Sequence, residues 1–360
     1  MWTEKVADAI HDPVRRLRFL RAVGPAWMTP RPSTLRRAAA VVLFGAAALG
    51  TAAFFLFSRA AARVPLLPVP PPPRAAAPLS PGVRGVWEVE NRNGLEVYSN
   101  GLRIDARFTV SNHPRSYLAF PASGAGGPFR RSQPAGILYH STESQIAPFE
   151  AGHNQALKRI GESLLDYVRR RRSYHFLIDR FGRVYRVVAE SDAAEHAGYS
   201  VWADEETVYL NLNESFFGIA FEARMGPARG EPAMTPAQTR SALMLTEMLR
   251  ARYGIPAADC VTHAQVSVNP DNMRMGYHVD WADGFPFSEL GLPDNYDTAL
   301  PAVWIFGFEC APGLLPAGAQ AAEGILARRA AALSQRPAAY RRRLQQQYRQ
   351  KLAAVRRPDT

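Results

Sequence analysis

Cysteine is almost missing from this chain. Its 360 residues contain two cysteines, Cys260 and Cys310. Two cysteines cannot build the disulfide framework of a small secreted domain, so the fold must be stabilised by a hydrophobic core. Their spacing leaves open whether they pair with each other or stay as free thiols.

A strong charge of one sign is also missing from most of the chain. The net charge is +11, but the excess lies at the two ends. Residues 1–37 carry eight Lys or Arg against three Asp or Glu, and residues 323–360 carry ten against two, which leaves −2 for the rest. This pattern argues against a nucleic-acid-binding core and for ends that meet an anionic lipid or polymer. For the C-terminal end, a simply solvated helix pair is an equally open reading.

A long uncharged run lies near the N-terminus, at residues 38–57. Twenty residues at about 1.5 Å each span roughly the 30 Å of a bilayer core, which predicts a transmembrane helix. A secretory signal peptide is the alternative, because Ala60 and Ala62 could form a cleavage site of small residues. More arginines precede the run than follow it, which predicts that residues 1–37 are cytoplasmic and that the remainder lies outside the membrane, in the periplasm or on the cell-wall side.

Two segments separate this run from the main domain. Residues 58–82 are rich in proline, which lacks the backbone N–H and fixes φ, so they are expected to form an extended spacer. Residues 83–125 are expected to form a small β extension. Within it, Asn100-Gly101 follows the apolar alternation of Leu95–Tyr98, which is a strong signal for a β-hairpin.

Strand and helix patterns alternate between residues 126 and 316. An apolar stripe with helical spacing predicts a helix between Leu157 and Val168, and a capping box of Thr235 and Gln238 begins a second helix that Gly254 ends. Apolar runs predict strands at 136–139, 174–178, 184–188, 216–221 and 260–262. We therefore expect an α/β domain with a mixed central β-sheet flanked by helices, followed by a basic helical tail at 317–360.

Potential metal ligands lie at or beyond the ends of these predicted strands. They are His140, His263, and the nearby pair of His278 and Asp280. A catalytic zinc site needs about three such ligands and keeps a fourth position for water. More than 100 residues separate the first ligand from the others, so no local motif marks a site. Hydrogen-bonded structural histidines remain an open alternative.

Several short motifs occur in an order that is typical of one family. Their sequences are ILYHST at 137–142, YHFLID at 174–179, HAGYSVW at 196–202, FGI at 217–219 and TH at 262–263. This order resembles the zinc-dependent N-acetylmuramoyl-L-alanine amidases, which include phage lysozyme-type amidases, AmpD-like enzymes and peptidoglycan recognition proteins. The resemblance covers about residues 134–290. Several motifs in one correct order are more specific than any single motif.

The resemblance implies a Zn²⁺ ion held by His140, His263 and Asp280. The third ligand is less well matched than the others, because the family's Asp-Pro-Gly is replaced here by Asp280-Trp281-Ala282. The loop between His263 and Asp280 is also longer than is typical. His278 is therefore the alternative third ligand.

The resemblance also implies residues that assist catalysis. Tyr174 matches a tyrosine that could orient the zinc-bound water or stabilise the oxyanion. AmpD-like enzymes carry a glutamate where this chain has Ala220, and Glu222, two residues on, would point to the same face of the strand and could act as general base. His278 stands where the enzymes often hold a lysine that stabilises the oxyanion, and a protonated imidazole could replace it.

His196 and Trp202 are expected to line the groove for the peptide stem, although a hydrogen-bonded structural role for His196 stays open. The function implied is hydrolysis of the amide between N-acetylmuramic acid and L-alanine in peptidoglycan, by a membrane-anchored enzyme. The alternative is a module of the same fold that binds muropeptide without cutting it, which Ala220 and His278 would suit. The sequence does not indicate an oligomeric state.

Overall fold

The computed structural model describes residues 85–225 and 233–356. The predicted cytoplasmic segment 1–37, the predicted membrane helix 38–57 and the proline-rich segment 58–82 lie outside the described residues. In the part of the chain that is described, no helix combines the length and the apolar character that a membrane crossing requires.

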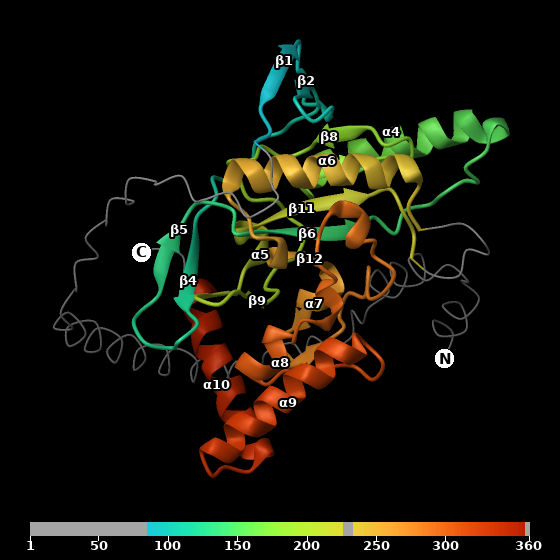
Figure 1. Cartoon of the computed structure of the whole chain (residues 1–360). Helices are drawn as coiled ribbons and strands as arrows, with labels where there is room; N and C mark the ends of the chain where they lie inside the picture. The colour runs from blue at the N-terminus through green and yellow to red at the C-terminus, as the bar shows by residue number, and fades with distance from the viewer. Residues whose placement is uncertain (1–84, 226–232, 357–360) are drawn as a thin grey trace, which may run out of the picture. The chain divides into compact units, whose positions relative to one another are not determined.

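An eight-stranded mixed sheet forms the centre of the domain, in the order β1-β2-β3-β8-β7-β11-β6-β12 (Figure 1). The neighbours β7, β11, β6 and β12 pair in parallel, whereas β7–β8, β1–β2 and β2–β3 are antiparallel. Its strands are β1 Glu88–Arg92, β2 Leu95–Tyr98, β3 Arg103–Asp105, β6 Gly136–Ser141, β7 Phe176–Ile178, β8 Val184–Arg186, β11 Phe216–Phe221 and β12 Cys260–Thr262. The expected α/β domain with a mixed central sheet is therefore present.

The hairpin predicted around Asn100-Gly101 joins β2 to β3, and β3 continues the main sheet by pairing in parallel with β8 through Ile104 and Val184. A smaller sheet lies beside the main one in the order β5-β4-β10-β9, and β13 pairs with β14 in a two-stranded ribbon. The bounds of these strands are β4 Tyr117–Pro121, β5 Phe129–Arg131, β9 Trp202–Ala203, β10 Thr207–Tyr209, β13 Val268–Asn269 and β14 Arg274–Met275.

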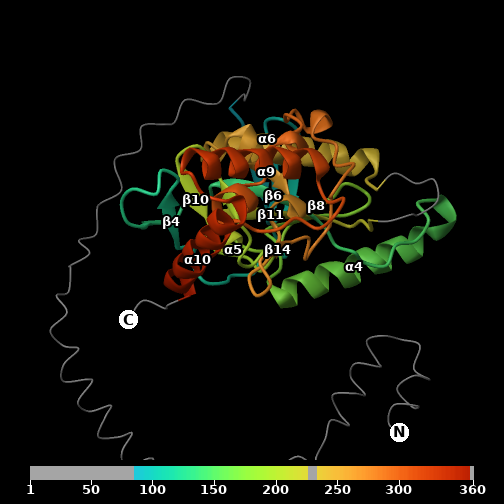
Figure 2. The ribbon, with the colours of Figure 1, turned by 90° about the horizontal axis from the view of Figure 1, so that it is seen from below.

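Helices cover both faces of the main sheet, with α4 on one side and α6 on the other (Figure 2). The α-helices are α4 Asn154–Arg171, α5 Leu212–Ser215, α6 Pro236–Tyr253, α7 His263–Val266, α8 Pro301–Phe306, α9 Pro316–Ala332 and α10 Pro337–Arg356. Short 3₁₀ turns occur at Ala151–His153, Ala257–Asp259, Ser288–Leu290 and Asn295–Asp297. In α6 the capping box of Thr235 and Gln238 is present, and Gly254 ends the helix at φ 67°.

The core is divided by the sheet. Ile137, Tyr139 and Ile219 face α6, where they pack with the apolar stripe of that helix. Leu177 and Ala220 face α4 instead. Side chains alternate between the two faces along a strand. The even-numbered residues of β6 and β11, such as Ala220, therefore point to the α4 face.

The basic C-terminal segment folds as a helical hairpin. Arg341 of α10 donates to both carboxylate oxygens of Glu323 in α9, at 2.6 and 2.7 Å, and to the carbonyls of Gly307 and Phe308. The helices α8, α9 and α10 gather at the end of the domain away from the β1–β2 hairpin (Figure 1).

The two cysteines are unpaired. Cys260 is buried in strand β12, and Cys310 is partly buried in the segment before α9. Burial raises the pKa of the Cys260 thiol to about 12, which keeps it protonated and unreactive at neutral pH.

Candidate metal centre

His140 is positioned by the central strands. It is the fifth residue of β6, directly beside Ala220 of β11 in the parallel register, and it therefore points to the α4 face of the sheet. Its side chain is 1% exposed. Parallel strands that end at one sheet edge bring side chains from distant sequence positions together, which is how His140 meets residues more than 100 positions away.

His263 and Asp280 come from the segment that follows the edge strand β12. His263 is the first residue of the short helix α7, whose capping box is formed by Thr262 and Gln265. The backbone N–H of Ala264 donates to the carbonyl of Asp280 at 3.2 Å, which ties the later loop to this helix. The loop is thereby folded back so that both side chains face His140.

The three side chains converge on one point. Nδ1 of His263 lies 2.9 Å from Oδ1 of Asp280, and Nδ1 of His140 lies 3.4 Å from Oδ2 of the same carboxylate. All three ligand atoms lie within 4.8 Å of one another, and the group is buried or nearly so. The structure brings Asp280 rather than His278 into this group.

The protonation states of the group suit a metal cation. Burial and the neighbouring His263 together lower the pKa of His140 to about 4, so this imidazole is neutral at pH 7. Burial alone would raise the pKa of Asp280, but the neighbouring His140 and His263 side chains hold it well below its usual range. Nε2 of His263 is buried without a hydrogen-bond partner. Two imidazoles and one carboxylate fit the donor set of a catalytic zinc site.

His196 lies directly behind His140. Its Nδ1 is 3.1 Å from Nε2 of His140, and the two rings are edge to face with their centroids 5.2 Å apart. Nε2 of His196 lies 3.3 Å from the carbonyl oxygen of Phe216. The structure thus places this residue in contact with the metal group.

Tyr174 and His278 border the group from two sides. The ring of Tyr174 lies 5.1 Å from that of His140, and its backbone has φ 62°, a conformation that non-glycine residues seldom adopt. The His278 ring stacks on His263 at 4.6 Å. Partial burial and the neighbouring His263 lower the pKa of His278, so the protonated form that the sequence suggested for it is disfavoured at pH 7.

Glu222 immediately follows β11 and shares strand parity with Ala220, so it lies on the α4 face like His140. It is buried, and one carboxylate oxygen accepts the backbone N–H of Arg180 at 3.2 Å. Burial raises its pKa to about 7. Its carboxyl group can therefore gain or lose a proton near neutral pH.

Trp202 is not brought to this site. It is the first residue of β9 in the smaller sheet, and its side chain is 2% exposed and packs among Tyr209 and Val261. Its Nε1 donates to Oδ1 of the buried Asp259 at 2.9 Å. The expectation that Trp202 lines a substrate groove is corrected accordingly, because an indole this deeply buried has no face left for a ligand.

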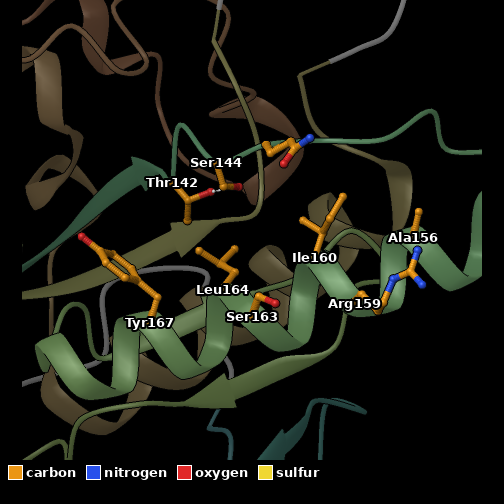
Figure 3. Close-up of a pocket in the computed structure, with 9 residues that line it drawn as sticks. Thr142, Ser144, Ala156, Arg159, Ile160, Ser163, Leu164 and Tyr167 are labelled. Carbon is orange, nitrogen blue, oxygen red and sulfur yellow. Dashed lines mark hydrogen bonds between the residues drawn. The ribbon is translucent and has the colours of Figure 1, made fainter. Parts of the chain in front are cut away.

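A pocket of about 660 Å³ opens between α4 and the loop after β6 (Figure 3). Thr142, two residues after His140, hydrogen-bonds to Ser144 at its wall. Burial raises the pKa of Tyr174, as do charge interactions with Asp280 and with the pocket residue Tyr167. The residues that line the pocket are Thr142, Ser144, Gln145, Ala156, Arg159, Ile160, Ser163, Leu164 and Tyr167.

Comparison with known families assigns the central part of the chain. Residues 130–275 match the sequence model of the N-acetylmuramoyl-L-alanine amidases. The similarity to that family is thus established for this segment of the chain. The match includes His140 and His263, while Asp280 lies five residues beyond it. The resemblance that the motif order indicated is therefore confirmed.

Solved structures of amidases align with parts of the chain. LysC from Clostridium intestinale is 24% identical over 52% of this chain and 93% of its own, with a TM-score of 0.28. AmpDh3 from Pseudomonas aeruginosa, in complex with an anhydromuramic pentapeptide, is 24% identical over 46% and 64%, with a TM-score of 0.31. AmiD from E. coli, in complex with its substrate anhydro-N-acetylmuramic acid-L-Ala-D-gamma-Glu-L-Lys, is 20% identical over 69% and 92%, with a TM-score of 0.36. No curated protein matches the chain.

Two residues that shape the site were not predicted as site residues, although one of them, Gly218, lies in the FGI motif at 217–219. Asn213 accepts the backbone N–H groups of His196, Ala197 and Gly198 through one side-chain oxygen. Gly218 of β11 leaves room for the His196 ring, because a Cβ at this position would lie 2.7 Å from the ring. A glycine inside a strand is a signal for such a close approach, and it could have found Gly218. No sequence signal marks Asn213.

Proposed function

We propose that this chain is a zinc-dependent amidase that hydrolyses the bond between N-acetylmuramic acid and L-alanine in peptidoglycan. The observation that carries the proposal is that potential ligand atoms of His140, His263 and Asp280 all lie within 4.8 Å of one another. Two of these residues lie in the segment that matches the amidase family. The pocket beside α4 is the proposed place for the substrate, because it begins two residues from His140.

The proposed chemistry divides between the metal and the neighbouring side chains. His140, His263 and Asp280 would hold the zinc ion, which when bound would lower the pKa of a water molecule toward neutrality and polarise the amide carbonyl. Tyr174 is protonated at neutral pH because burial raises its pKa, so its hydroxyl can donate to the oxygen of the scissile amide. The neutral His278 ring stacks on His263 and can donate a second hydrogen bond to the same amide oxygen.

Proton transfer to the leaving amine needs a group that titrates near neutral pH. Glu222 has this property, with a pKa of about 7, and it shares the sheet face of His140. We assign Glu222 the role of general base, which accepts a proton from the attacking water and then delivers it to the leaving amine. Tyr174 keeps the role of hydrogen-bond donor to the amide oxygen.

The test of this function compares two histidine variants of the full-length protein. His140→Ala removes a proposed ligand, whereas His153→Ala changes a partly exposed histidine in the 3₁₀ turn before α4. Bound zinc is measured by elemental analysis, and muropeptide cleavage is followed by mass spectrometry. We expect His140→Ala to lose both zinc and cleavage and His153→Ala to keep both. Full cleavage by His140→Ala would overturn the proposal.

A muropeptide-binding module is the second candidate. Ala220, which stands beside His140 in the register where AmpD-like enzymes carry their glutamate, is the observation that favours it. Such a module would bind muropeptide with measurable affinity and leave the amide intact with zinc present. The same mass spectrometric assay, run beside a calorimetric binding measurement, separates the two functions.

We also propose that residues 38–57 anchor the protein in the cytoplasmic membrane, with the amidase domain outside. The support is the twenty-residue uncharged run and the arginine excess before it. In membrane fractions, the anchored protein should resist extraction by high salt, and protease added to the outer side should digest the domain. Extraction of the intact full-length chain by salt alone would contradict the anchor.

A further inference from the structure

The imidazole of His140 spans the space between two partners. Its Nδ1 faces the carboxylate of Asp280 at 3.4 Å, and its Nε2 faces Nδ1 of His196 at 3.1 Å. A neutral imidazole carries one proton, and the nitrogen without the proton is the one that can bind a metal. Both neighbours therefore bear on which nitrogen of His140 carries the proton, and the contact with His196 is the shorter of the two.

His196 can offer only an acceptor to His140. Its Nε2 lies 3.3 Å from the carbonyl oxygen of Phe216, and a carbonyl accepts but never donates. The ring proton of a neutral His196 therefore lies on Nε2, which leaves a lone pair on Nδ1. In this arrangement Nε2 of His140 donates to Nδ1 of His196 at 3.1 Å, and Nδ1 of His140 is unprotonated on the side of Asp280.

The His196 ring is held in place by two features of the chain. The side-chain oxygen of Asn213 accepts the backbone N–H groups of residues 196, 197 and 198 at 2.6–2.8 Å, which fixes the loop. The ring then lies against Gly218, where a Cβ would approach its Cγ to 2.7 Å. Neither feature is a hydrogen bond between strands of the sheet. Both define the position of His196.

We infer that His196 is a positioning residue that fixes the tautomer of His140, so that Nδ1 of His140 is directed toward the point it shares with His263 and Asp280. The inference rests on the proposed metal function of that group. Outer partners that orient a metal-binding histidine typically change metal affinity by about 10–100-fold when they are removed. His196 thus acts through His140 and does not itself bind the ion.

The first test uses two substitutions at position 196 of the full-length protein. His196→Phe keeps a ring of similar shape but removes the acceptor, whereas His196→Asn keeps an acceptor oxygen near the place of Nδ1. Zinc affinity is measured by competition with a chromophoric chelator. We expect His196→Phe to bind zinc about 10–100-fold more weakly than the wild type, with affinity partly restored in His196→Asn.

A second test displaces the ring without changing it. Gly218→Ala should push His196 away from its place and weaken zinc binding in the same direction as His196→Phe. Gly152→Ala is the matched control, because no atom lies within 4 Å of a Cβ at that position and its φ is not positive. Thermal unfolding of the metal-free variants shows whether each remains folded before its zinc affinity is compared.

The tautomer is read directly in the metal-free protein by ¹⁵N NMR of the histidine rings. The inference predicts a proton on Nε2 of His140 in the wild type and a loss of that preference in His196→Phe. A folded His196→Phe variant that binds zinc as tightly as the wild type would overturn it, and so would a proton on Nδ1 of His140 in the wild type. A wild-type protein that shows the predicted tautomer but binds no zinc would instead refute the proposed function and leave the tautomer assignment standing.

Discussion

Nδ1 of His263 lies 2.9 Å from Oδ1 of Asp280, closer than the 3.4 Å that separates Nδ1 of His140 from Oδ2 of the same carboxylate. The carboxylate supplies the one negative charge of the three ligands, because its pKa is held well below the usual range by the two histidines. His278 is close by in sequence, but its ring stacks on His263 rather than joining the group.

This relationship distinguishes the two sequence-based choices for the third ligand. Asp280→Asn keeps the shape of the side chain and removes its charge, so we expect the zinc affinity to fall by more than about 100-fold. This loss is larger than the about 10–100-fold effect of removing a residue that only orients a metal ligand. His278→Ala should keep its zinc. Both affinities are measured by chelator competition, and zinc retained in Asp280→Asn but lost in His278→Ala would make His278 the ligand.

Tyr174 borders His140 with its ring 5.1 Å away and a protonated hydroxyl. Tyr174→Phe removes only that hydroxyl, so kcat should fall by about 10²–10⁴-fold while the zinc content stays that of the wild type. Tyr340→Phe is the control, because it also removes a tyrosine hydroxyl but lies in helix α10, far from Tyr174 in the sequence. A Tyr174→Phe enzyme with unchanged kcat would remove Tyr174 from the mechanism.

Glu222 gives the fold a pH dependence that one substitution removes. Burial raises its pKa from 4.5 to about 7, so the folded protein holds this proton more tightly than the unfolded chain does. Its contribution to the free energy of unfolding is therefore complete below pH 4.5 and is lost as the pH rises through 7, by up to about 3 kcal/mol.

We accordingly expect Glu222→Gln to gain stability relative to the wild type as the pH rises from 4.5 to 8. Urea unfolding of the two proteins across this range measures the difference, and the buried Asp259, whose pKa is also raised, is common to both. Two curves that stay parallel would show that the carboxyl group of Glu222 titrates normally in the folded protein. The same variant should have kcat about 10²-fold lower, because it cannot accept a proton.

Trp202 provides a test of the corrected site. Trp202→Phe leaves the carboxyl group of Asp259 without its indole partner, which should lower the free energy of unfolding by about 1–3 kcal/mol. KM for a muropeptide should remain unchanged, because the indole is buried away from the substrate. A several-fold rise in KM in a variant of unchanged stability would show that Trp202 contacts the substrate after all.

Local signals were sufficient for much of the fold. Helix α6 carries its own start and stop, in the capping box at Thr235 and the left-handed Gly254, and the structure confirms both. The hairpin at Asn100-Gly101 was equally local. Its attachment to the main sheet was not predictable, because the parallel contact of Ile104 with Val184 joins positions 80 residues apart and no periodicity records such a pairing.

The residues of the site show the same difference between local sequence signals and contacts made only in the folded chain. His140 and His263 followed from the order of motifs, and the structure brings them within reach of Asp280. The position of Trp202 depends instead on Asp259, 57 residues away, and the sequence of an aromatic motif does not tell a buried indole from an exposed one. The support that Asn213 gives to the His196 loop is likewise a contact between loops, which only the folded chain defines.

Zinc-dependent amide hydrolysis is tested by digesting intact peptidoglycan with the full-length protein, with and without a metal chelator, and analysing the products by mass spectrometry. We expect stem peptides with a free L-alanine amine and no new reducing sugar ends. These products should be lost with the chelator and restored by added zinc. Release of the same peptides in the presence of chelator, or cleavage at sugar bonds in place of the amide, would contradict it.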